Sequence, residues 1–163
     1  MERQPPTILV DADACPVKDE VYRVAARHKV QAFVVSNSPF RVPDSPLISR
    51  VLVSDAFDAA DDWIAEHADP HSIVITGDIL LADRCLKAGA TVLAHTGKPF
   101  TAGSIGGAIA ARAIMADLRA GMDGPGGGPP PFAKADRSRF LQALDQALVK
   151  LAASGERRRA ATR

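Results

Sequence analysis

The sequence predicts a three-layer α/β/α fold with a mainly parallel central sheet. Short apolar, β-branched segments alternate along the chain with longer segments whose apolar residues recur at helical spacing. Hydrophobic residues make up 47% of the chain but aromatic residues only 5%, so aliphatic side chains must fill the core, which suits helices packed on buried strands. The length of 163 residues favours one domain, which we place at residues 1–153.

The first half of the chain is expected to contain three strands and two helices. The strands span residues 7–10, 32–35 and 51–53, and the helices span residues 17–28 and 58–68. Pro16 suits the first turn of the first helix, where its missing N–H leaves no hydrogen bond unmade, and Asp58 can cap the second helix. The Pro-rich residues 39–46 are expected to form a loop between the second and third strands.

The second half is expected to add two strands and three helices. These strands span residues 72–76 and 91–94, and the helices span residues 79–88, 104–120 and 136–151. Gly89 suits the C-terminal end of the first of these helices, and Ser104 and Asp136 can cap the N-termini of the other two. We expect a flexible loop at the Gly- and Pro-rich residues 121–131 and a disordered, basic tail at residues 154–163.

Net charge, cysteine content and hydropathy indicate which classes of protein the chain can belong to. The net charge is +1, so no basic field over the whole molecule indicates a nucleic-acid partner. Cys15 and Cys85 stand alone rather than in a CxxC pair, which is typical of a reduced, intracellular chain. No apolar run approaches the roughly 18 residues that span a bilayer. We therefore expect a cytoplasmic protein with no membrane contact.

Aspartates follow two of the predicted strands directly. Asp11 and Asp13 come after the first strand, and Asp78 comes after the fourth. Ligands bind outside the carboxyl ends of parallel strands, so these side chains should face one site. Like charges held close together are unfavourable unless a cation or a proton compensates, and Mg²⁺ or Mn²⁺ takes oxygen ligands. The pattern favours a metal site, and the alternative is that these aspartates are structural caps.

A third acidic group and the histidines point less clearly to a site. Asp58, Asp61 and Asp62 share one helical face, although an acidic first turn also favours the helix dipole without any further role. Asp83 could point either to the site or to solvent. The histidines show no spacing typical of metal ligands, and we expect surface or cap positions for all four, which are His28, His67, His71 and His95.

Residues 11–18, Asp-Ala-Asp-Ala-Cys-Pro-Val-Lys, resemble the YaiI/YqxD family, a bacterial family without an assigned activity. The resemblance covers roughly residues 8–148. Its further pieces are Ser36-Asn37, Arg41-Val-Pro43, Phe57-Asp58-Ala-Ala-Asp61, Ile73-Val-Ile-Thr76, Asp78, Leu81-Ala82, Lys87-Ala-Gly-Ala90, Arg112, Leu118-Arg119 and Asp136-Arg137 with Phe140. The octapeptide of residues 11–18 is highly specific for the family. The shorter pieces are less specific singly, but their occurrence in the same order as in the family supports the resemblance strongly.

The chain departs from the family pattern at several positions. Leu80 stands where the family usually has proline, and Gly77 and Ser104 replace commoner residues. Asp62 and Asp83 fall where the family is not expected to require an acid. These two acids therefore rank below the other five as candidates for the site.

The family in turn resembles PIN-like nuclease domains. In those domains an aspartate after the first strand, an acid on a middle helix and an aspartate after a later strand bind Mg²⁺ or Mn²⁺. The resemblance implies a PIN-like fold and hydrolysis of phosphodiesters, RNA in particular, with Asp11 and Asp78 as the catalytic pair. On this resemblance the metal ligands are Asp11, either Asp58 or Asp61, and Asp78. With Asp13, which shares a turn with Asp11, the candidate metal ligands are Asp11, Asp13, Asp58, Asp61 and Asp78. The substrate contacts would come from Lys18, Asn37, Arg41 and Arg112, of which the three cations suit phosphates.

Two other functions stay open. A phosphatase of the haloacid dehalogenase type would use Asp11 as nucleophile and Asp13 as acid and base, with Asp78 and Asp83 at Mg²⁺. That class also needs a lysine before its acidic motif, and no lysine lies between Lys29 and Asp78. A non-catalytic module that binds RNA, a nucleotide or a protein would keep the acidic residues as a relic or as a structural metal site. The oligomeric state is open as well.

Overall fold

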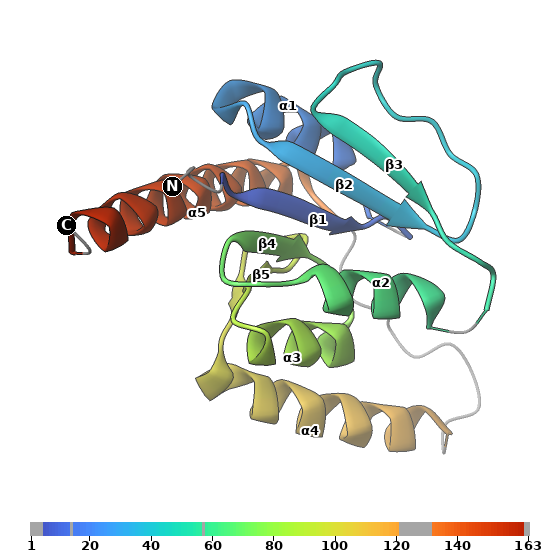
Figure 1. The fold of residues 1–163 in the computed structure, drawn as a ribbon. Coiled ribbons are helices and arrows are strands. Elements are labelled where there is room, and N and C mark those ends of the chain that lie inside the picture. The colour runs from blue at the N-terminus through green and yellow to red at the C-terminus, as the bar shows by residue number, and fades with distance from the viewer. Residues whose placement is uncertain (1–4, 14, 57, 121–131, 162–163) are drawn as a thin grey trace.

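The protein is built on a six-stranded sheet between two layers of helices (Figure 1). The computed structural model describes residues 5–13, 15–56, 58–120 and 132–161. The strands are β1 (Thr7–Asp11), β2 (Gln31–Ser36), β3 (Ile48–Leu52), β4 (Ser72–Ile75), β5 (Thr91–Leu93) and β6 (Pro99–Phe100). Their order is β3-β2-β1-β4-β5-β6, and all neighbours are parallel except β5 and β6. The predicted three-layer fold with a mainly parallel sheet is confirmed.

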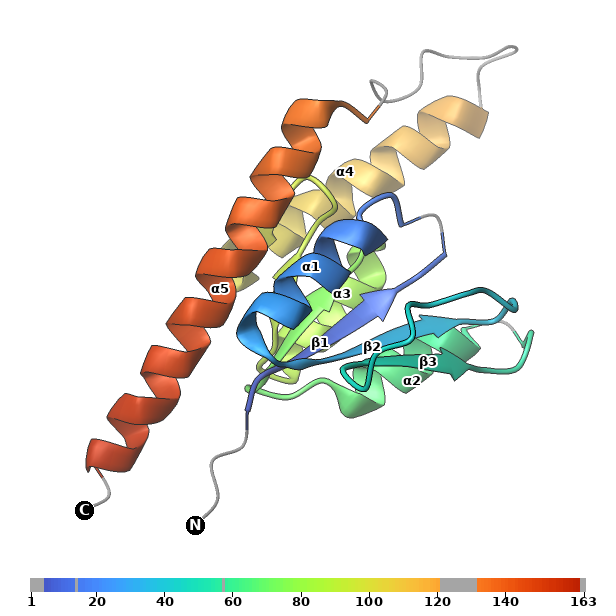
Figure 2. The ribbon, with the colours of Figure 1, turned by 90° about the horizontal axis from the view of Figure 1, so that it is seen from above.

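The helices of the described residues divide between the two faces of the sheet. Helices α1 (Lys18–His28) and α5 (Lys134–Ala161) lie side by side on one face (Figure 2). Helices α2 (Ala59–His67), α3 (Ile79–Lys87) and α4 (Ala102–Ala120) lie on the other, with α4 packed on α3 (Figure 1). None of these helices is both long and apolar enough to cross a membrane.

The alternation of side chains along the strands divides the core into two clusters. The cluster under α1 and α5 includes Ile8, Val10, Ile73, Ile75, Phe140, Leu144 and Leu148. The cluster under α2 and α3 includes Leu9, Ile64, Val74, Leu81, Cys85 and Val92. Leu9 faces α2 and α3, and Asp11, two residues further along β1, faces the same way.

Several element boundaries differ from the prediction. Strand β3 begins at Ile48 rather than at residue 51. Strand β6 was not predicted, because a strand of two residues is too short to show any periodicity. Helix α5 was expected to end at residue 151 and continues to Ala161, so most of the segment expected to be a disordered tail has a helical backbone. The predicted Gly/Pro loop 121–131 lies outside the described residues.

The predicted helix caps are only partly correct. Thr101, rather than Ser104, precedes α4, and the backbone N–H of each residue donates to the hydroxyl of the other at 3.1 Å. Asp136 lies in the first turn of α5, where its Oδ2 accepts the N–H of Ala133 at 2.9 Å. Asp58 does precede α2, but its backbone is left-handed, with a φ of 65°, and its side chain makes no capping hydrogen bond.

Candidate functional site

The strand order places the carboxyl ends of β1 and β4 side by side at the point where the chain changes direction across the sheet. The chain runs outward from β1 to β2 and β3, and then returns to place β4 on the other side of β1. Open α/β sheets bind ligands at such a reversal. Val10 pairs with Ile75 in the register of the two strands, so Asp11 and Thr76 come next to each other.

Asp11 is the last residue of β1 and the central acid of the site. Its side chain faces α2 and α3, and Thr76 Oγ1 donates a hydrogen bond to its Oδ2 at 3.0 Å. Burial raises the pKa of Asp11 to about 6, although the hydrogen bond from Thr76 acts in the opposite direction. Three neighbouring carboxylates raise this pKa further, namely those of Asp61, Asp13 and Asp78.

Asp78 is held in the turn between β4 and α3. The hydroxyl oxygen of the fully buried Thr76 accepts the backbone N–H of Asp78 at 3.0 Å. Asp78 Oδ1 in turn accepts the N–H groups of Leu80 and Leu81, at 2.9 and 3.2 Å, and so caps α3. Thr76 therefore holds both predicted catalytic aspartates at the same end of β4.

Asp13 is fixed in a similar way from the other side of β1. Ser36, the last residue of β2, donates from its buried hydroxyl to Asp13 Oδ1 at 2.9 Å. The same hydroxyl oxygen accepts the N–H of Ser38 at 3.0 Å. Each strand that flanks β1 thus provides one hydroxyl group that positions one carboxylate.

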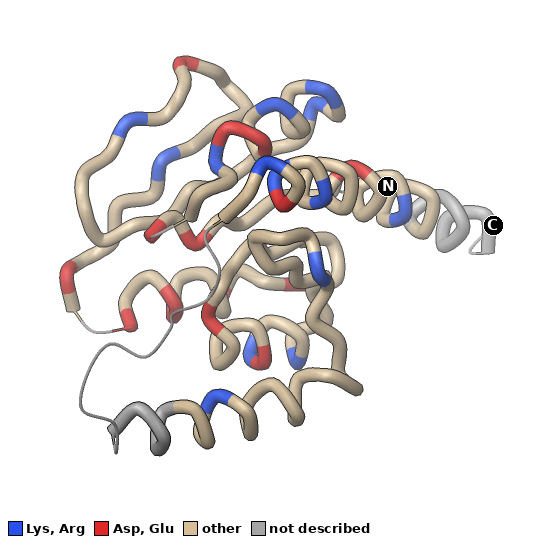
Figure 3. The backbone as a smooth tube through the Cα atoms, turned by 180° about the vertical axis from the view of Figure 1, so that it is seen from behind, with Lys and Arg blue, Asp and Glu red and all other residues tan. Residues whose placement is uncertain are grey.

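The start of α2 brings a further pair of carboxylates toward the site. Burial raises the pKa of Asp61, and the negative charges of Asp78 and Asp58 raise it further, while Arg84 lowers it. No hydrogen bond within the described residues fixes the side chain of Asp58 or Asp61, in contrast to the acids after β1 and β4. In Figure 3 several acidic residues lie near one another where the strands end and α2 and α3 begin, and others are spread over the rest of the chain.

These acids line two adjoining hollows, which together we call the acidic site. The first hollow is lined by Asp11, Asp13, Gly77, Asp78, Ile79, His95 and Arg112. The second is lined by Asp13, Asn37, Asp55, Ala56, Asp58, Ala59, Ala60, Asp61, Asp78 and Arg112. The two hollows share Asp13, Asp78 and Arg112. All five predicted metal ligands therefore line this surface, together with the predicted substrate residues Asn37 and Arg112.

The other candidate residues lie outside both hollows. Lys18 and Arg41 line neither, and the ammonium of Lys18 lies 5.8 Å from the ring centre of Phe40. The two lower-ranked acids form ion pairs on the helix surfaces instead. Asp62 pairs with Arg84 and Asp83 pairs with Lys87, each at 2.9 Å.

Sequence reasoning missed several residues of the acidic site. Thr76 was predicted as the last residue of a strand and Ser36 as the residue after one, and no role was predicted for either hydroxyl, although their position beside aspartates in neighbouring strands was a usable signal. Asp55 lines the second hollow from the loop before α2. His95 was expected at the surface or in a cap; it is half-buried and lines the first hollow. The only hint for His95 was its position just after a predicted strand.

The donor chemistry of the acidic site suits a hard divalent cation. Carboxylate oxygens are the ligands that Mg²⁺ and Mn²⁺ prefer. Burial and neighbouring carboxylates raise the pKa of Asp11, so a nearby cation would favour its ionised form. Among the described residues, however, no three Asp, Glu, His or Cys side chains are grouped closely enough to hold one ion. A metal would therefore have to draw some of these side chains together.

Comparison with known proteins finds relatives along almost the whole chain. The family described as "Uncharacterized BCR, YaiI/YqxD family" matches residues 9–150. A UPF0178 protein of Sphingopyxis alaskensis is 74% identical over 146 residues, which cover 90% of this chain and 95% of that protein. A UPF0178 protein of a Jannaschia species is 59% identical over 91% of this chain and 96% of its own length. A UPF0178 protein of Caulobacter vibrioides is 56% identical over 88% of this chain and 94% of its own length. No solved structure matches the chain.

Proposed function

The chain belongs to the YaiI/YqxD family, and we propose that it is a Mg²⁺- or Mn²⁺-dependent phosphodiesterase that cleaves RNA at the acidic site. One observation carries the proposal. Carboxylates from β1, α2 and the β4–α3 turn line two adjoining hollows where the strand order reverses, and burial together with these neighbouring carboxylates raises the pKa of Asp11. The resemblance to PIN-like nuclease domains supports the same function.

The carboxylates of the acidic site would hold the metal. Asp11 and Asp78 are its direct ligands in this proposal, and Asp13, Asp58 and Asp61 hold a second ion or orient water molecules. A bound Mg²⁺ or Mn²⁺ would polarise the scissile phosphate and lower the pKa of an attacking water molecule. Thr76 would keep Asp11 and the Asp78 turn in place, because it bonds to both.

The substrate-binding residues follow from what lines the hollows and what does not. Arg112 lines both hollows, and no hydrogen bond or ion pair with the described residues occupies its guanidinium, so it can bind a phosphate. Asn37 would contact the sugar or base of a nucleotide from the second hollow. Lys18 and Arg41 lie further away and would bind flanking phosphates of a longer RNA strand.

A second candidate function is a module that binds RNA without cleaving it. The observation that favours it is the spacing of the acids, since no three acids, histidines or cysteines of the described residues already form a cation site. A haloacid-dehalogenase-type phosphatase is less favoured, because the cation that lines both hollows is the guanidinium of Arg112 and not a lysine ammonium.

Incubation of the purified protein with end-labelled single-stranded RNA, in EDTA, Mg²⁺ or Mn²⁺, tests the proposal. We expect cleavage in one of the two metals and a loss of about 100-fold or more in the Asp11→Asn variant. Asp83→Asn is the matched control, because it removes a carboxylate that pairs with Lys87 outside the acidic site. Cleavage that survives Asp11→Asn would exclude this site. RNA binding without cleavage in any divalent ion would favour the second candidate.

A further inference from the structure

Among the described residues that line the first hollow, His95 is the one with a buried side-chain nitrogen that lacks a hydrogen-bond partner. It lies in the loop after β5, and it lines the first hollow together with Asp11 and Asp78. Its Nε2 atom is covered by surrounding atoms and yet has no hydrogen-bond partner among the described residues. A buried polar atom without a partner is unfavourable, so pairing it with a ligand would recover free energy.

The imidazole of His95 is placed against the turn that carries Asp78. A Cβ atom at Gly77 would lie 3.2 Å from Cε1 and 3.9 Å from Nε2 of His95. The ring therefore occupies space that a side chain at position 77 would fill. This contact joins the loop after β5 to the same turn that Thr76 fastens to Asp11.

The state of the ring suits contact with a phosphate oxygen. Burial lowers the pKa of His95, so the imidazole is mainly neutral at neutral pH. A neutral imidazole has one N–H donor and one acceptor nitrogen, whereas the oxygens of a phosphodiester only accept. Only the tautomer that is protonated at Nε2 can donate a hydrogen bond from that atom to a phosphate oxygen.

We propose that His95 is a substrate-binding residue, whose Nε2–H donates to a non-bridging phosphate oxygen of RNA once the ring turns toward the first hollow. This inference rests on the proposed function, which supplies the phosphodiester. The phosphate would then be bound by a charged donor from α4, Arg112, and by a neutral donor from the loop after β5. Because burial lowers the pKa of His95, the neutral form of the ring is favoured, and a neutral ring forms no ion pair with the carboxylates of the hollow.

Two variants separate hydrogen bonding from ring shape. His95→Gln places an amide nitrogen near the position of Nε2, and His95→Phe keeps a ring without a polar atom. The probe is a fluorescein-labelled single-stranded RNA dodecamer with unmodified phosphates, and its binding is measured by fluorescence anisotropy in Ca²⁺, a hard cation that also takes oxygen ligands. We expect His95→Phe to weaken binding about three- to ten-fold, which corresponds to one neutral hydrogen bond, and His95→Gln to stay within about two-fold of the wild type.

The nitrogen NMR resonances of the His95 ring give a second readout on the full-length wild-type protein. The Nε2 resonance should shift when the RNA dodecamer is added, and this measurement decides alone if His95→Phe does not fold. Equal binding by the wild type and His95→Phe, or equal losses in His95→Phe and His95→Gln, would overturn the role of His95 and leave the proposed function standing. A wild-type protein that neither binds nor cleaves RNA would overturn the proposed function, and this inference with it.

Discussion

Replacement of Asp11 by asparagine should stabilise the fold at neutral pH although it removes a residue of the acidic site. The pKa of Asp11 rises from 3.8 to about 6 on folding, and at about 1.4 kcal/mol per pKa unit its ionisation costs about 3 kcal/mol at neutral pH. Solvent reaches part of this carboxylate, which lowers the figure to about 1–2 kcal/mol. Asparagine carries no charge and can still accept the hydrogen bond from Thr76.

The raised pKa of Asp11 also determines how the free energy of unfolding changes with pH. Because the pKa of Asp11 is raised in the folded state, its favourable contribution is complete below pH 3.8 and is lost as the pH rises through about 6. The wild type should therefore lose about 1–2 kcal/mol relative to Asp11→Asn between pH 4 and pH 7.

Urea unfolding of metal-free protein at several pH values between 4 and 7.5 measures this difference. Asp83→Asn serves again as the control, and its difference from the wild type should not follow the same course. Added Mn²⁺ should stabilise the wild type more than Asp11→Asn, because a cation offsets the same charge cost. Parallel pH profiles for the wild type and Asp11→Asn, or a less stable Asp11→Asn variant at pH 7, would refute this reasoning.

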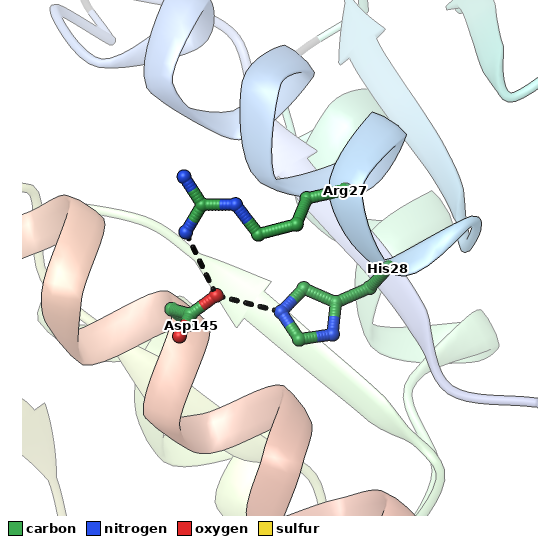
Figure 4. Close-up of polar contacts among 3 residues, drawn as sticks. All are labelled: Arg27, His28 and Asp145. Carbon is green, nitrogen blue, oxygen red and sulfur yellow. Dashed lines mark hydrogen bonds and ion pairs between the residues drawn. The ribbon is translucent and has the colours of Figure 1, made fainter.

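Three further predictions concern side chains that hold the fold together. Thr76→Val, which keeps the shape but removes the buried hydroxyl, should cost about 1–2 kcal/mol in urea unfolding, since the partly buried N–H of Asp78 loses its partner. Asp145→Asn should cost about 0.5–1 kcal/mol at pH 7, because Asp145 Oδ1 lies 2.7 Å from His28 Nε2 and 3.2 Å from Arg27 Nη1 (Figure 4). These contacts lower the pKa of Asp145, so unfolding at acid pH should show this loss disappear below pH 3.8. Leu144→Ala, which truncates a fully buried side chain of α5, should lower the free energy of unfolding by about 2–5 kcal/mol.

The parts of the site that could be predicted are those that depend on strand order alone. Asp11 and Asp78 follow strands whose apolar, β-branched composition identifies them, and parallel pairing brings such residues to one edge. Lys18 and Arg41 were predicted from their charge alone, and neither lies at the end of a strand or lines a hollow. Lys18 opens a helix and Arg41 lies in a loop, where the direction of a side chain depends on local backbone turns that hydrophobic periodicity does not encode.

The residues that were missed act through contacts between distant segments. The residues around Thr76 in the sequence do not indicate that its hydroxyl donates to Asp11. This contact can be inferred only when the pairing of Val10 with Ile75 is known. The position of His95 could not be predicted from neighbouring residues either. It requires that β5 lies beside β4 and that residue 77 has no side chain. Sequence patterns identified the elements, whereas register and packing decided which side chains meet.

The hydrogen bonds of the acidic site divide it into a fixed part and an adjustable part. Asp13 and Asp11 are each held by a hydroxyl at the end of a flanking strand, and Asp78 is held by its bonds to the start of α3. The carboxylates of Asp58 and Asp61, at the start of α2, have no such bonds within the described residues. In the proposed reaction a cation would therefore meet the fixed acids first and draw the α2 acids toward it. Metal binding at this surface would need such a movement, because no three Asp, Glu, His or Cys side chains of the described residues are grouped closely enough to hold an ion.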